Sequence, residues 1–334
     1  MPKTRVAVLI PMPMRGRILD DTSEARLDAM AEVIAAPDGV PTSEALPSLL
    51  NGARMAITGW GTPPLTADIL AGARDLELVA HTAGSIRRLV PPEAIEAGLH
   101  VSHAAAIIAD AVAELVLGQT LRYLRNLDQM DARMKSGTEW LEIRHDYPGR
   151  LLGDQVVGIV GTGHVGRTVI ARFRAFGATV LAADPYLGEL QALELGVTKV
   201  ELDEIFTRSD IVSLHAPALP ETIGIVDSRR LALMRDGSLF INMSRGALVR
   251  EDELITELRR NRIFAALDVF AIEPLGVGSP LREMVNVYLS PHAAGQTADT
   301  YLRQGRAMVD EVERYLAGEP LQYEVSVGAL STMA

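Results

Sequence analysis

The chain has 334 residues, of which 48% are hydrophobic, and it contains no cysteine. This length supports a large core and predicts two domains. The lack of cysteine excludes disulfide frameworks, thiolate zinc sites and cysteine nucleophiles. The formal net charge of −11 disfavours nucleic acid and anionic membranes as partners, whereas a local arginine can still bind a small acidic substrate.

Apolar runs in the chain do not predict a membrane segment. The run from Val6 to Ile10 is too short for the core of a signal peptide and fits a buried strand. The longest apolar stretch, "HAAAIIADAVAELVLGQTL", is interrupted by Asp110 and Glu114, which predicts a mostly buried helix. We therefore expect a cytoplasmic protein without a membrane partner.

The first part of the chain alternates short β-branched runs with helical patterns. Strands are expected at "RVAVLI", "RMAITGW", "LELVAHTA" and "LHVSHA". Helices are expected over residues 23–35, from 66 and from 92, followed by a long helix over 107–135. Because strands separated by helices are typical of parallel sheets, this pattern predicts α/β architecture.

A looser segment over residues 136–154 separates this pattern from a second alternation. Strands are expected there at "QVVGIVG", "ATVLAAD", "DIVSLHA", "GSLFINMS", "FAALDVF" and "NVYLS". Helices are expected over 164–177, near 203, 228 and 251, and over 297–316, with a weakly structured tail after the last one. Two alternations predict two domains, with the long helix as a crossover between them.

The segment "VVGIVGTGHVGRTV" places a G-x-G-x-x-G pattern between a strand and a helix. Gly161 permits a tight turn, Gly163 lets the backbone approach a pyrophosphate, and Gly166 permits close packing of helix and strand. Asp184 follows about twenty residues later, at the end of the next expected strand. A carboxylate there accepts hydrogen bonds from ribose hydroxyls and repels a 2′-phosphate, which favours NAD over NADP.

Four polar residues follow other expected strands of the same sheet: Arg245, Asp268, Glu273 and His292. Taken singly, they are ordinarily a surface arginine, turn or capping carboxylates and a loop histidine. Because ligands of open α/β sheets bind at the carboxyl ends of strands, four together indicate a site. An arginine can bind a carboxylate in bidentate fashion, and a carboxylate beside an imidazole favours the protonated ring. With a nicotinamide cofactor, this set predicts a 2-hydroxy acid dehydrogenase.

From about residue 53 to 300 the chain resembles the D-isomer-specific 2-hydroxyacid dehydrogenases. The matching phrases are "GIVGTGHVGR", "AADPYL", "DIVSLHAPALPET", "INMSRGALV", "AALDVF", "EP" and "SPHAAGQT". The resemblance implies that Arg245 binds and polarises the substrate, that His292 is the acid/base and that Glu273 is its partner. It also implies that Asp268 holds the nicotinamide carboxamide.

The resemblance further implies an NAD site at the strand ends and a substrate site. The implied NAD contacts are Gly161, Gly163, His164, Val165, Gly166, Asp184, His215, Pro217, Thr222, Met243, Ser244, Asp268, Ala293 and Gly295. The implied substrate contacts are Ala83, Gly84 and Arg245, with Trp60 bordering the substrate or packing in the core. No metal is expected, because His100 and His103 fall on opposite faces of a strand.

Fold and assembly also follow from the resemblance. It implies a Rossmann NAD-binding domain over 105–299 and a flavodoxin-like substrate domain made of 1–104 and 300–334. A homodimer through the NAD-binding domain is expected.

The sequence departs from the family pattern in the substrate loop "HTAGSIRRL", where Thr82 replaces a glycine and Ile86-Arg87 replace an acidic pattern. Arg87 and Arg88, like Arg15 and Arg17, are surface residues or ligands of a second acidic group. We expect a hydroxypyruvate or glyoxylate reductase. The alternatives are a D-3-phosphoglycerate dehydrogenase or an NAD(H)-sensing interaction protein without turnover.

Overall fold

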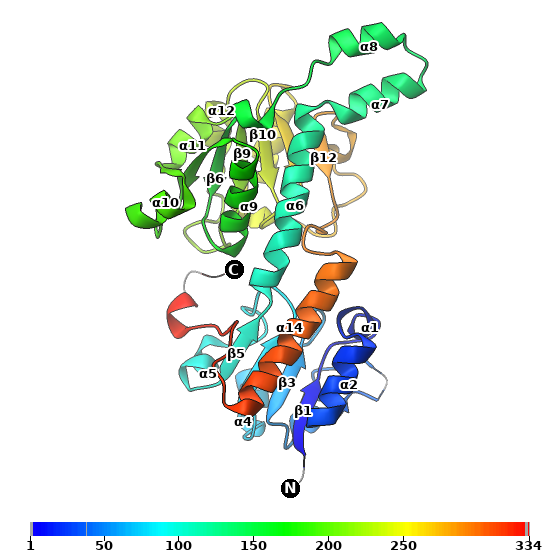
Figure 1. Cartoon of the computed structure of the whole chain (residues 1–334), viewed down its shortest axis with the longest axis vertical. Helices are drawn as coiled ribbons and strands as arrows, with labels where there is room; N and C mark the ends of the chain where they lie inside the picture. The colour runs from blue at the N-terminus through cyan, green and yellow to red at the C-terminus, as the bar shows by residue number, and fades with distance from the viewer. Residues whose placement is uncertain (1–2, 38, 331–332, 334) are drawn as a thin grey trace. The chain divides into compact units, whose positions relative to one another are not determined.

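The computed structural model describes residues 3–37, 39–330 and 333 (Figure 1). They divide into two compact units, a terminal unit of residues 1–108 and 296–334 and a central unit of residues 109–295. The chain leaves the terminal unit within α6 (Ala105–Leu124) and returns to it just before α14 (Ala298–Ala317). Each unit is an α/β layer structure built on one parallel sheet.

The terminal unit contains a five-stranded parallel sheet in the order β2-β1-β3-β4-β5. This order is that of flavodoxin-like folds. Its strands are β1 (Thr4–Val8), β2 (Ala31–Ala35), β3 (Met55–Thr58), β4 (Leu78–His81) and β5 (His100–His103).

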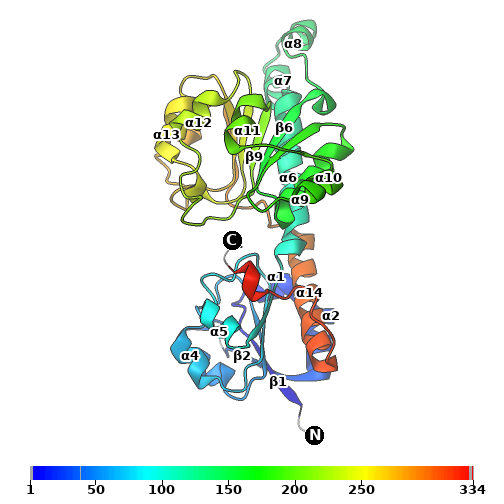
Figure 2. The ribbon, with the colours of Figure 1, turned by 90° about the vertical axis from the view of Figure 1, so that its left-hand side faces the viewer.

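Helices cover both faces of this sheet, so alternate residues of each strand enter different cores. Val6 and Val8 pack in one core with helices α1, α2 and α14, whereas Ala7 and Leu9 pack in another with α3 and α5 (Figure 2). The remaining helices of this unit are α1 (Arg15–Ile18), α2 (Asp21–Met30), α3 (Leu46–Leu50), α4 (Ala67–Gly72), α5 (Pro92–Glu96) and the 3-10 turn η4 (Val327–Ala329). Burial on both faces explains why the inner strands β3 and β4 are almost continuously apolar.

The central unit contains a seven-stranded parallel sheet in the order β12-β11-β10-β9-β6-β7-β8. Read from β8, this is the Rossmann order with one added edge strand. Its strands are β6 (Val156–Val160), β7 (Thr179–Ala183), β8 (Thr198–Lys199), β9 (Ile211–Leu214), β10 (Leu239–Asn242), β11 (Phe264–Leu267) and β12 (Val287–Leu289).

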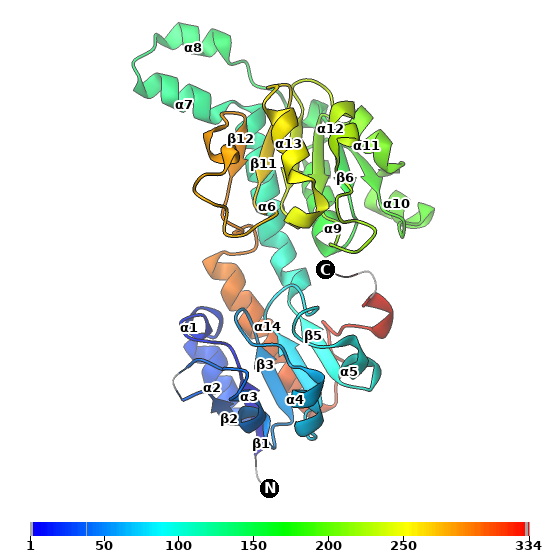
Figure 3. The same cartoon turned by 180° about the vertical axis from the view of Figure 1, so that it is seen from behind.

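One face of the central sheet is covered by α6 and α9, and the other by α11, α12 and α13 (Figures 1 and 3). Two further helices, α7 and α8, project from the body of this unit as an arm (Figure 3). The helices and 3-10 turns of this unit, besides α6, are α7 (Leu127–Lys135), α8 (Trp140–Asp146), η1 (Leu152–Asp154), α9 (His164–Ala175), α10 (Glu189–Leu195), α11 (Leu202–Arg208), α12 (Ser228–Leu233), η2 (Gly246–Leu248), α13 (Glu251–Leu258) and η3 (Pro280–Glu283).

Two helices expected from the sequence are shorter than predicted. The first ends at Met30, because Val33 pairs with Val6 and the following five residues form strand β2. The long helix ends at Leu124, and the chain turns at Asn126, whose φ of 52° is left-handed. Asparagine tolerates this conformation, so a new helix, α7, can start in a different direction.

Three further elements were not expected. Helix α8 lies in the segment predicted to be loose, and α10 and β8 lie between the strands predicted at 178–184 and 210–216. These elements are short, so their patterns are hard to distinguish from loops.

The tail after α14 is more ordered than expected. The carboxylate of Glu311, which is fully buried, accepts hydrogen bonds from the main-chain N–H groups of Gln322 and Tyr323 and from the hydroxyl of Ser102 on β5. The N–H of Val325 donates to the carbonyl of Val101 at 2.7 Å. The tail therefore pairs with the edge strand of the terminal sheet.

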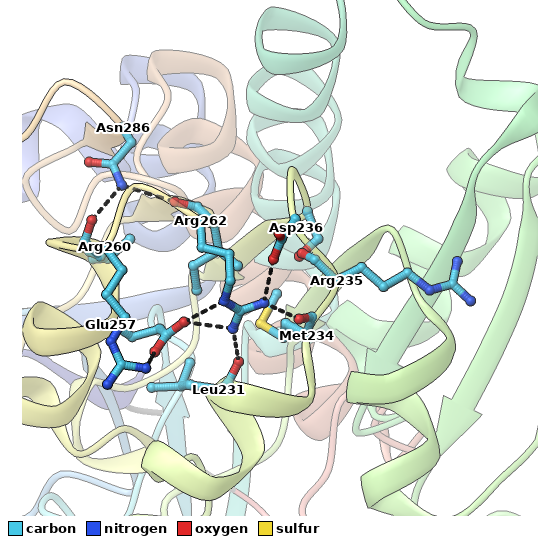
Figure 4. Close-up of polar contacts among 11 residues, drawn as sticks. Leu231, Met234, Arg235, Asp236, Glu257, Arg260, Arg262 and Asn286 are labelled. Atoms are coloured by element: carbon cyan, nitrogen blue, oxygen red, sulfur yellow. Dashed lines mark hydrogen bonds and ion pairs between the residues drawn. The ribbon is translucent and has the colours of Figure 1, made fainter.

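A buried ion pair stabilises the central unit at the turn before β11 (Figure 4). Glu257 on α13 is 4% exposed, and its carboxylate accepts two hydrogen bonds from Arg262, at 2.6 and 2.8 Å. The same guanidinium donates to the carbonyls of Leu231 and Met234 at the end of α12. Arg262 therefore connects helices α12 and α13 to the start of strand β11.

Candidate active site

The glycine-rich turn after β6 has a backbone course that side chains would obstruct. Gly161 has a φ of 93°, and a Cβ there would lie 2.7 Å from the nitrogen of Ala216. A Cβ on Gly166 would lie 2.1 Å from the carbonyl oxygen of Gly161. Gly163 is the N-cap of α9 and offers no side chain to the first-turn N–H groups, so the helix start can receive a phosphate. His164 and Val165 begin that helix.

Asp184, at the end of β7, is bonded to this turn. Its Oδ2 accepts hydrogen bonds from the N–H of Thr162 at 2.6 Å and from the Thr162 hydroxyl at 2.8 Å. Its Oδ1 accepts the N–H of Tyr186 at 2.8 Å. The structure thus brings the predicted ribose ligand to the predicted phosphate turn. Sequence reasoning missed Thr162, because a threonine between two glycines carries no pattern of its own.

The turn after β9 lies directly behind the glycine-rich turn. His215 is buried, and its Nε2 lies 2.8 Å from the hydroxyl oxygen of Ser213. Burial lowers the pKa of His215 to about 3, so its ring is neutral at physiological pH. The Thr222 hydroxyl donates to the carbonyl of Pro217 at 2.6 Å and closes the turn. The side chains of His215 and Thr222 thus support the turn, and the NAD contact expected of this segment stays a prediction.

Arg245 follows β10, next to the turn after β9. The hydroxyl of Ser244 donates to the carbonyl of Ala216 at 2.7 Å, and Met243 is buried beneath it. The buried side chain of Asn242 donates to the Arg245 carbonyl at 3.0 Å, which fixes the backbone there. The strand ends that carry the expected NAD contacts are therefore hydrogen-bonded to one another.

His292 and Glu273 lie in contact, as expected from the sequence. The Nδ1 of His292 lies 2.6 Å from Oε2 of Glu273, and Oε1 of Glu273 accepts the N–H of Phe270 at 3.0 Å. Both side chains are partly exposed, at 40% for His292 and 34% for Glu273. Because Glu273 engages Nδ1, proton exchange with a substrate would use Nε2.

Asp268 holds the loop that carries His292. It is 1% exposed, and its carboxylate accepts hydrogen bonds from the hydroxyl of Ser290 and from the N–H groups of Ala293 and Ala294, at 2.5 to 2.9 Å. Its carbonyl accepts the N–H of His292, whose φ is 52°. Sequence reasoning missed this use of Asp268, and the expected contact with nicotinamide stays a prediction, as does that of Gly295 at the end of the loop.

A cavity of about 550 Å³ lies beside the His292–Glu273 pair within the central unit. Apart from this pair, Ser290 and Arg282, its lining is apolar: Phe270, Pro274, Leu275, Leu289 and Pro291. The guanidinium of Arg282 donates to the carbonyls of Leu275 and Gly276 and so closes the loop that forms one wall.

In the terminal unit, Ala83 and Gly84 follow β4 at the carboxyl edge of the sheet. In the part of the chain that the structure describes, neither N–H group donates to a protein acceptor, although Ala83 is only 3% exposed. Buried N–H groups are nearly always paired, so this loop has donors suited to an anionic ligand. Trp60, which follows β3 at the same edge, is 41% exposed and therefore does not belong to the core.

The arginines left open by the sequence differ in their contacts. Arg87 is exposed, and its guanidinium donates to the carbonyls of Leu330 and Met333. Arg15 pairs with Glu24 at 2.8 Å. Both side chains thus have protein partners.

None of the helices that the structure describes is long and apolar enough to cross a membrane. No three His, Asp or Glu side chains in the described ranges gather as ligands of a metal ion.

Known proteins share both the sequence and the fold. The profile of the D-isomer specific 2-hydroxyacid dehydrogenase NAD-binding domain matches residues 117–294, which is more than half of the chain. A hydroxypyruvate reductase of Thermotoga maritima is 31% identical over 255 residues, covering 75% of this chain and 81% of that protein. The chain belongs to the D-isomer specific 2-hydroxyacid dehydrogenase family.

Other members of the family differ in length and in the activity for which they are named. A D-3-phosphoglycerate dehydrogenase of Mycobacterium tuberculosis is 35% identical over 263 residues, which are 78% of this chain and 49% of that protein. The chain spans about half the length of most of the curated relatives it matches. A solved phosphoglycerate oxidoreductase of Rhizobium etli superposes with a TM-score of 0.81 at 26% identity, over 97% of this chain and 99% of that one. The match supports NAD as the cofactor, and the glycine-rich turn with Asp184 fits it.

Proposed function

We propose that this family member interconverts a D-2-hydroxy acid and its 2-oxo acid, with a substrate of the hydroxypyruvate or glyoxylate type. The observation that carries the proposal is the 2.6 Å contact between His292 and Glu273. It lies at the carboxyl edge of the sheet whose strand β6 carries the glycine-rich turn. A proton donor and a dinucleotide site on one edge are what carbonyl reduction requires.

Each catalytic residue has a distinct proposed task. When bound, the cofactor would accept a hydride as NAD or donate one as NADH. Arg245 binds the substrate carboxylate and polarises the keto group. His292 gives a proton from Nε2 to the carbonyl oxygen during reduction, and Glu273 stabilises the imidazolium through Nδ1.

The loop after β4 is the proposed second contact for the carboxylate. The N–H groups of Ala83 and Gly84 are its donors, and Trp60 is proposed to border the substrate. These donors act through the main chain, so they recognise any 2-oxo acid and leave the choice among such acids to the side-chain pocket.

A 3-phosphoglycerate dehydrogenase is the second candidate, and the names of several relatives favour it. A phosphate group requires cationic partners. Arg87 and Arg15 already bind the tail carbonyls and Glu24, whereas Arg17 and Arg88 are exposed. The second candidate would therefore depend on Arg17 or Arg88.

We also propose a homodimer through the arm formed by α7 and α8. Several apolar side chains on the arm are about half exposed, at 50% for Met134, 56% for Trp140 and 60% for Leu141. Apolar area on a projecting element is typical of an interface. In analytical sedimentation the wild-type protein should be a dimer. The double variant Trp140→Glu/Leu141→Glu should be a monomer.

The decisive experiment measures NADH oxidation across a panel of 2-oxo acids for wild type and His292→Asn. The variant should lose about 10²- to 10⁴-fold in kcat, because it lacks the proton donor. Its Kd for NADH should stay within about twofold of wild type, since asparagine removes no group from the glycine-rich turn. His100→Asn, at the amino edge of the terminal sheet, is the matched control and should leave both values unchanged.

Three outcomes separate the candidates. Preference for hydroxypyruvate or glyoxylate supports the proposal, and preference for phosphohydroxypyruvate supports the second candidate. Tight NADH binding without turnover of any acid supports an NAD(H)-sensing protein. Full activity of His292→Asn contradicts the assignment of the acid/base.

A further inference from the structure

A buried histidine lies directly beneath the loop after β4. His81 is the last residue of that strand and is 4% exposed. Its Nδ1 lies 2.9 Å from the hydroxyl oxygen of Thr58, the last residue of β3. Its ring also forms a hydrogen bond with the main chain of Ser85, at the far end of the loop.

The near end of the loop is bonded to the same threonine. Both the N–H and the hydroxyl of Thr82 donate to the carbonyl of Thr58, at 2.8 and 2.9 Å. The N–H of Ala104 donates to the carbonyls of His81 and Ala83, at 3.1 and 3.0 Å. The loop from Thr82 to Ser85 is therefore attached at both ends, and the N–H groups of its middle residues donate to no protein acceptor among the described residues.

The protonation of His81 is fixed by its surroundings. Burial and the nearby His103 lower the pKa of His81 to about 4, so the ring is neutral at physiological pH and carries one N–H. The Ser85 contact favours the protonated ring, as expected when a ring N–H donates to a carbonyl. Because Nδ1 faces Thr58, the N–H is on Nε2, and Nδ1 accepts the Thr58 hydroxyl.

We propose that His81 is a positioning residue for substrate binding: with Thr58 it holds the loop so that the N–H groups of Ala83 and Gly84 converge on the substrate carboxylate. This inference rests on the proposed function. Directional N–H donors bind an anion well only when their orientation is set before binding. His81 acts through the loop and exchanges no proton with the substrate, since its ring is buried.

The test compares three variants with wild type. Asparagine places a polar group near Nδ1 of the histidine but none near Nε2, whereas glutamine places one near Nε2. His81→Asn should raise the KM for the preferred 2-oxo acid about tenfold, the size of one lost hydrogen bond of roughly 1.4 kcal/mol. The kcat should change by less than about threefold, because the reacting groups are untouched. His81→Gln should recover most of the KM.

A second readout avoids turnover. Oxalate, an unreactive analogue with a carboxylate beside a carbonyl oxygen, is titrated into the protein–NADH complex and followed by NADH fluorescence. Its Kd should rise about tenfold in His81→Asn, while the Kd of NADH stays the same. The pH profile of kcat should also stay the same, whereas it would shift if His81 were an acid or base. His100→Asn is the matched control on the neighbouring strand and should behave as wild type.

Thr58→Val keeps the inference testable if His81→Asn does not fold. Valine has nearly the same shape and removes the hydroxyl that faces Nδ1, so, like His81→Gln, it should raise the same KM and the same oxalate Kd by less than His81→Asn does. Unchanged values in every folded variant would overturn the role of His81. Wild-type protein that neither reduces 2-oxo acids nor binds oxalate would instead contradict the proposed function.

Discussion

In the central unit the loop after β6 owes its course to glycines, whereas in the terminal unit the loop after β4 is held by side chains. Gly161 and Gly166 approach other backbone atoms so closely that a Cβ has no room. The loop from Thr82 to Ser85 is instead attached through Thr58 and His81. Glycines at fixed spacing leave a recognisable sequence pattern, but side-chain contacts between strands do not.

Two buried glutamates, one in each unit, are held by different partners. In the central unit Glu257 is paired with the guanidinium of Arg262. In the terminal unit Glu311 accepts hydrogen bonds from a hydroxyl and two main-chain N–H groups, all of them neutral. Glu257 therefore has a charged partner, whereas the three donors to Glu311 are neutral groups on distant segments. Asp268 of the central unit is held in the same way as Glu311, so the contrast is between these two glutamates rather than between the units.

The largest expected effect comes from filling the space at Gly166. Gly166→Ala should lower NADH affinity by at least about 100-fold or prevent folding of the central unit, because its Cβ would lie 2.1 Å from a carbonyl oxygen. Gly163→Ala is the matched variant, since nothing lies within 4 Å of a Cβ there. It should leave the melting temperature unchanged. If the pyrophosphate approaches this residue, Gly163→Ala should also weaken NADH binding, which fluorescence titration measures. Equal behaviour of the two variants would contradict the steric explanation.

Removing the buried cation of the central unit should have the next largest effect. Arg262→Ala should lower the free energy of unfolding by about 2–4 kcal/mol, because the buried Glu257 would keep only the exposed Arg260 as its partner and two carbonyls at the end of α12 would lose their donor. Arg260 also pairs with Glu257, but its side chain is 64% exposed. Arg260→Ala should therefore cost less than about 1 kcal/mol. Urea unfolding of both variants measures the difference, and similar losses would contradict the importance of burial.

Ser102→Ala provides the comparison in the terminal unit. It removes one hydrogen bond from a neutral hydroxyl to Glu311, so it should cost about 1–2 kcal/mol in the same urea experiment. A loss as large as that of Arg262→Ala would show that the two glutamates do not differ in this respect.

The smallest expected effect is on pH dependence, and each unit contributes one buried histidine. The pKa of His81 is about 4 and that of His215 about 3, both below the ordinary value of 6.5. At pH values between about 4 and 6.5 the unfolded chain binds more protons than the folded one. The free energy of unfolding therefore falls as the pH is lowered through this range. From pH 6.5 to 5.5 each histidine should cost about 1 kcal/mol.

Variants separate the two contributions to this slope. His81→Gln should reduce the loss of stability between pH 6.5 and 5.5 by about 1 kcal/mol, and His100→Asn, in which an exposed ring is replaced, should not reduce it. Thermal unfolding across this range measures both. An unchanged slope in His81→Gln would mean that the pKa of His81 does not differ between the folded and the unfolded protein.

Residue patterns along the chain predicted those features of the structure that are determined within one segment of the sequence. The fold class and the NAD-binding family were confirmed. The glycine-rich turn lies where expected, and the contact of His292 with Glu273, nineteen residues apart, followed from strand ends meeting at one edge. The catalytic roles themselves stay predictions.

These patterns did not predict features that depend on contacts between distant segments. Strand β2 was expected to be helical, because pairing of Val33 with Val6 is invisible in a local window. The contacts of Asp184 with Thr162 and of His81 with Ser85 depend on side chains that meet only after folding. The tail was expected to be loose, because its stabilising partner, Glu311, looks like an ordinary helix residue.

The discontinuous terminal unit has a consequence for the order of synthesis. Its five strands lie within the first 103 residues, but α14, which covers one face of their sheet, begins only at Ala298. The whole central unit leaves the ribosome between them and can fold first, since domains generally fold as units during translation. Until Met308 and Val312 emerge, the apolar face around Val6 and Ile57 is covered only by α1 and α2. The part of the protein made first is therefore the part completed last, and in the nascent chain this face is where chaperones are expected to bind.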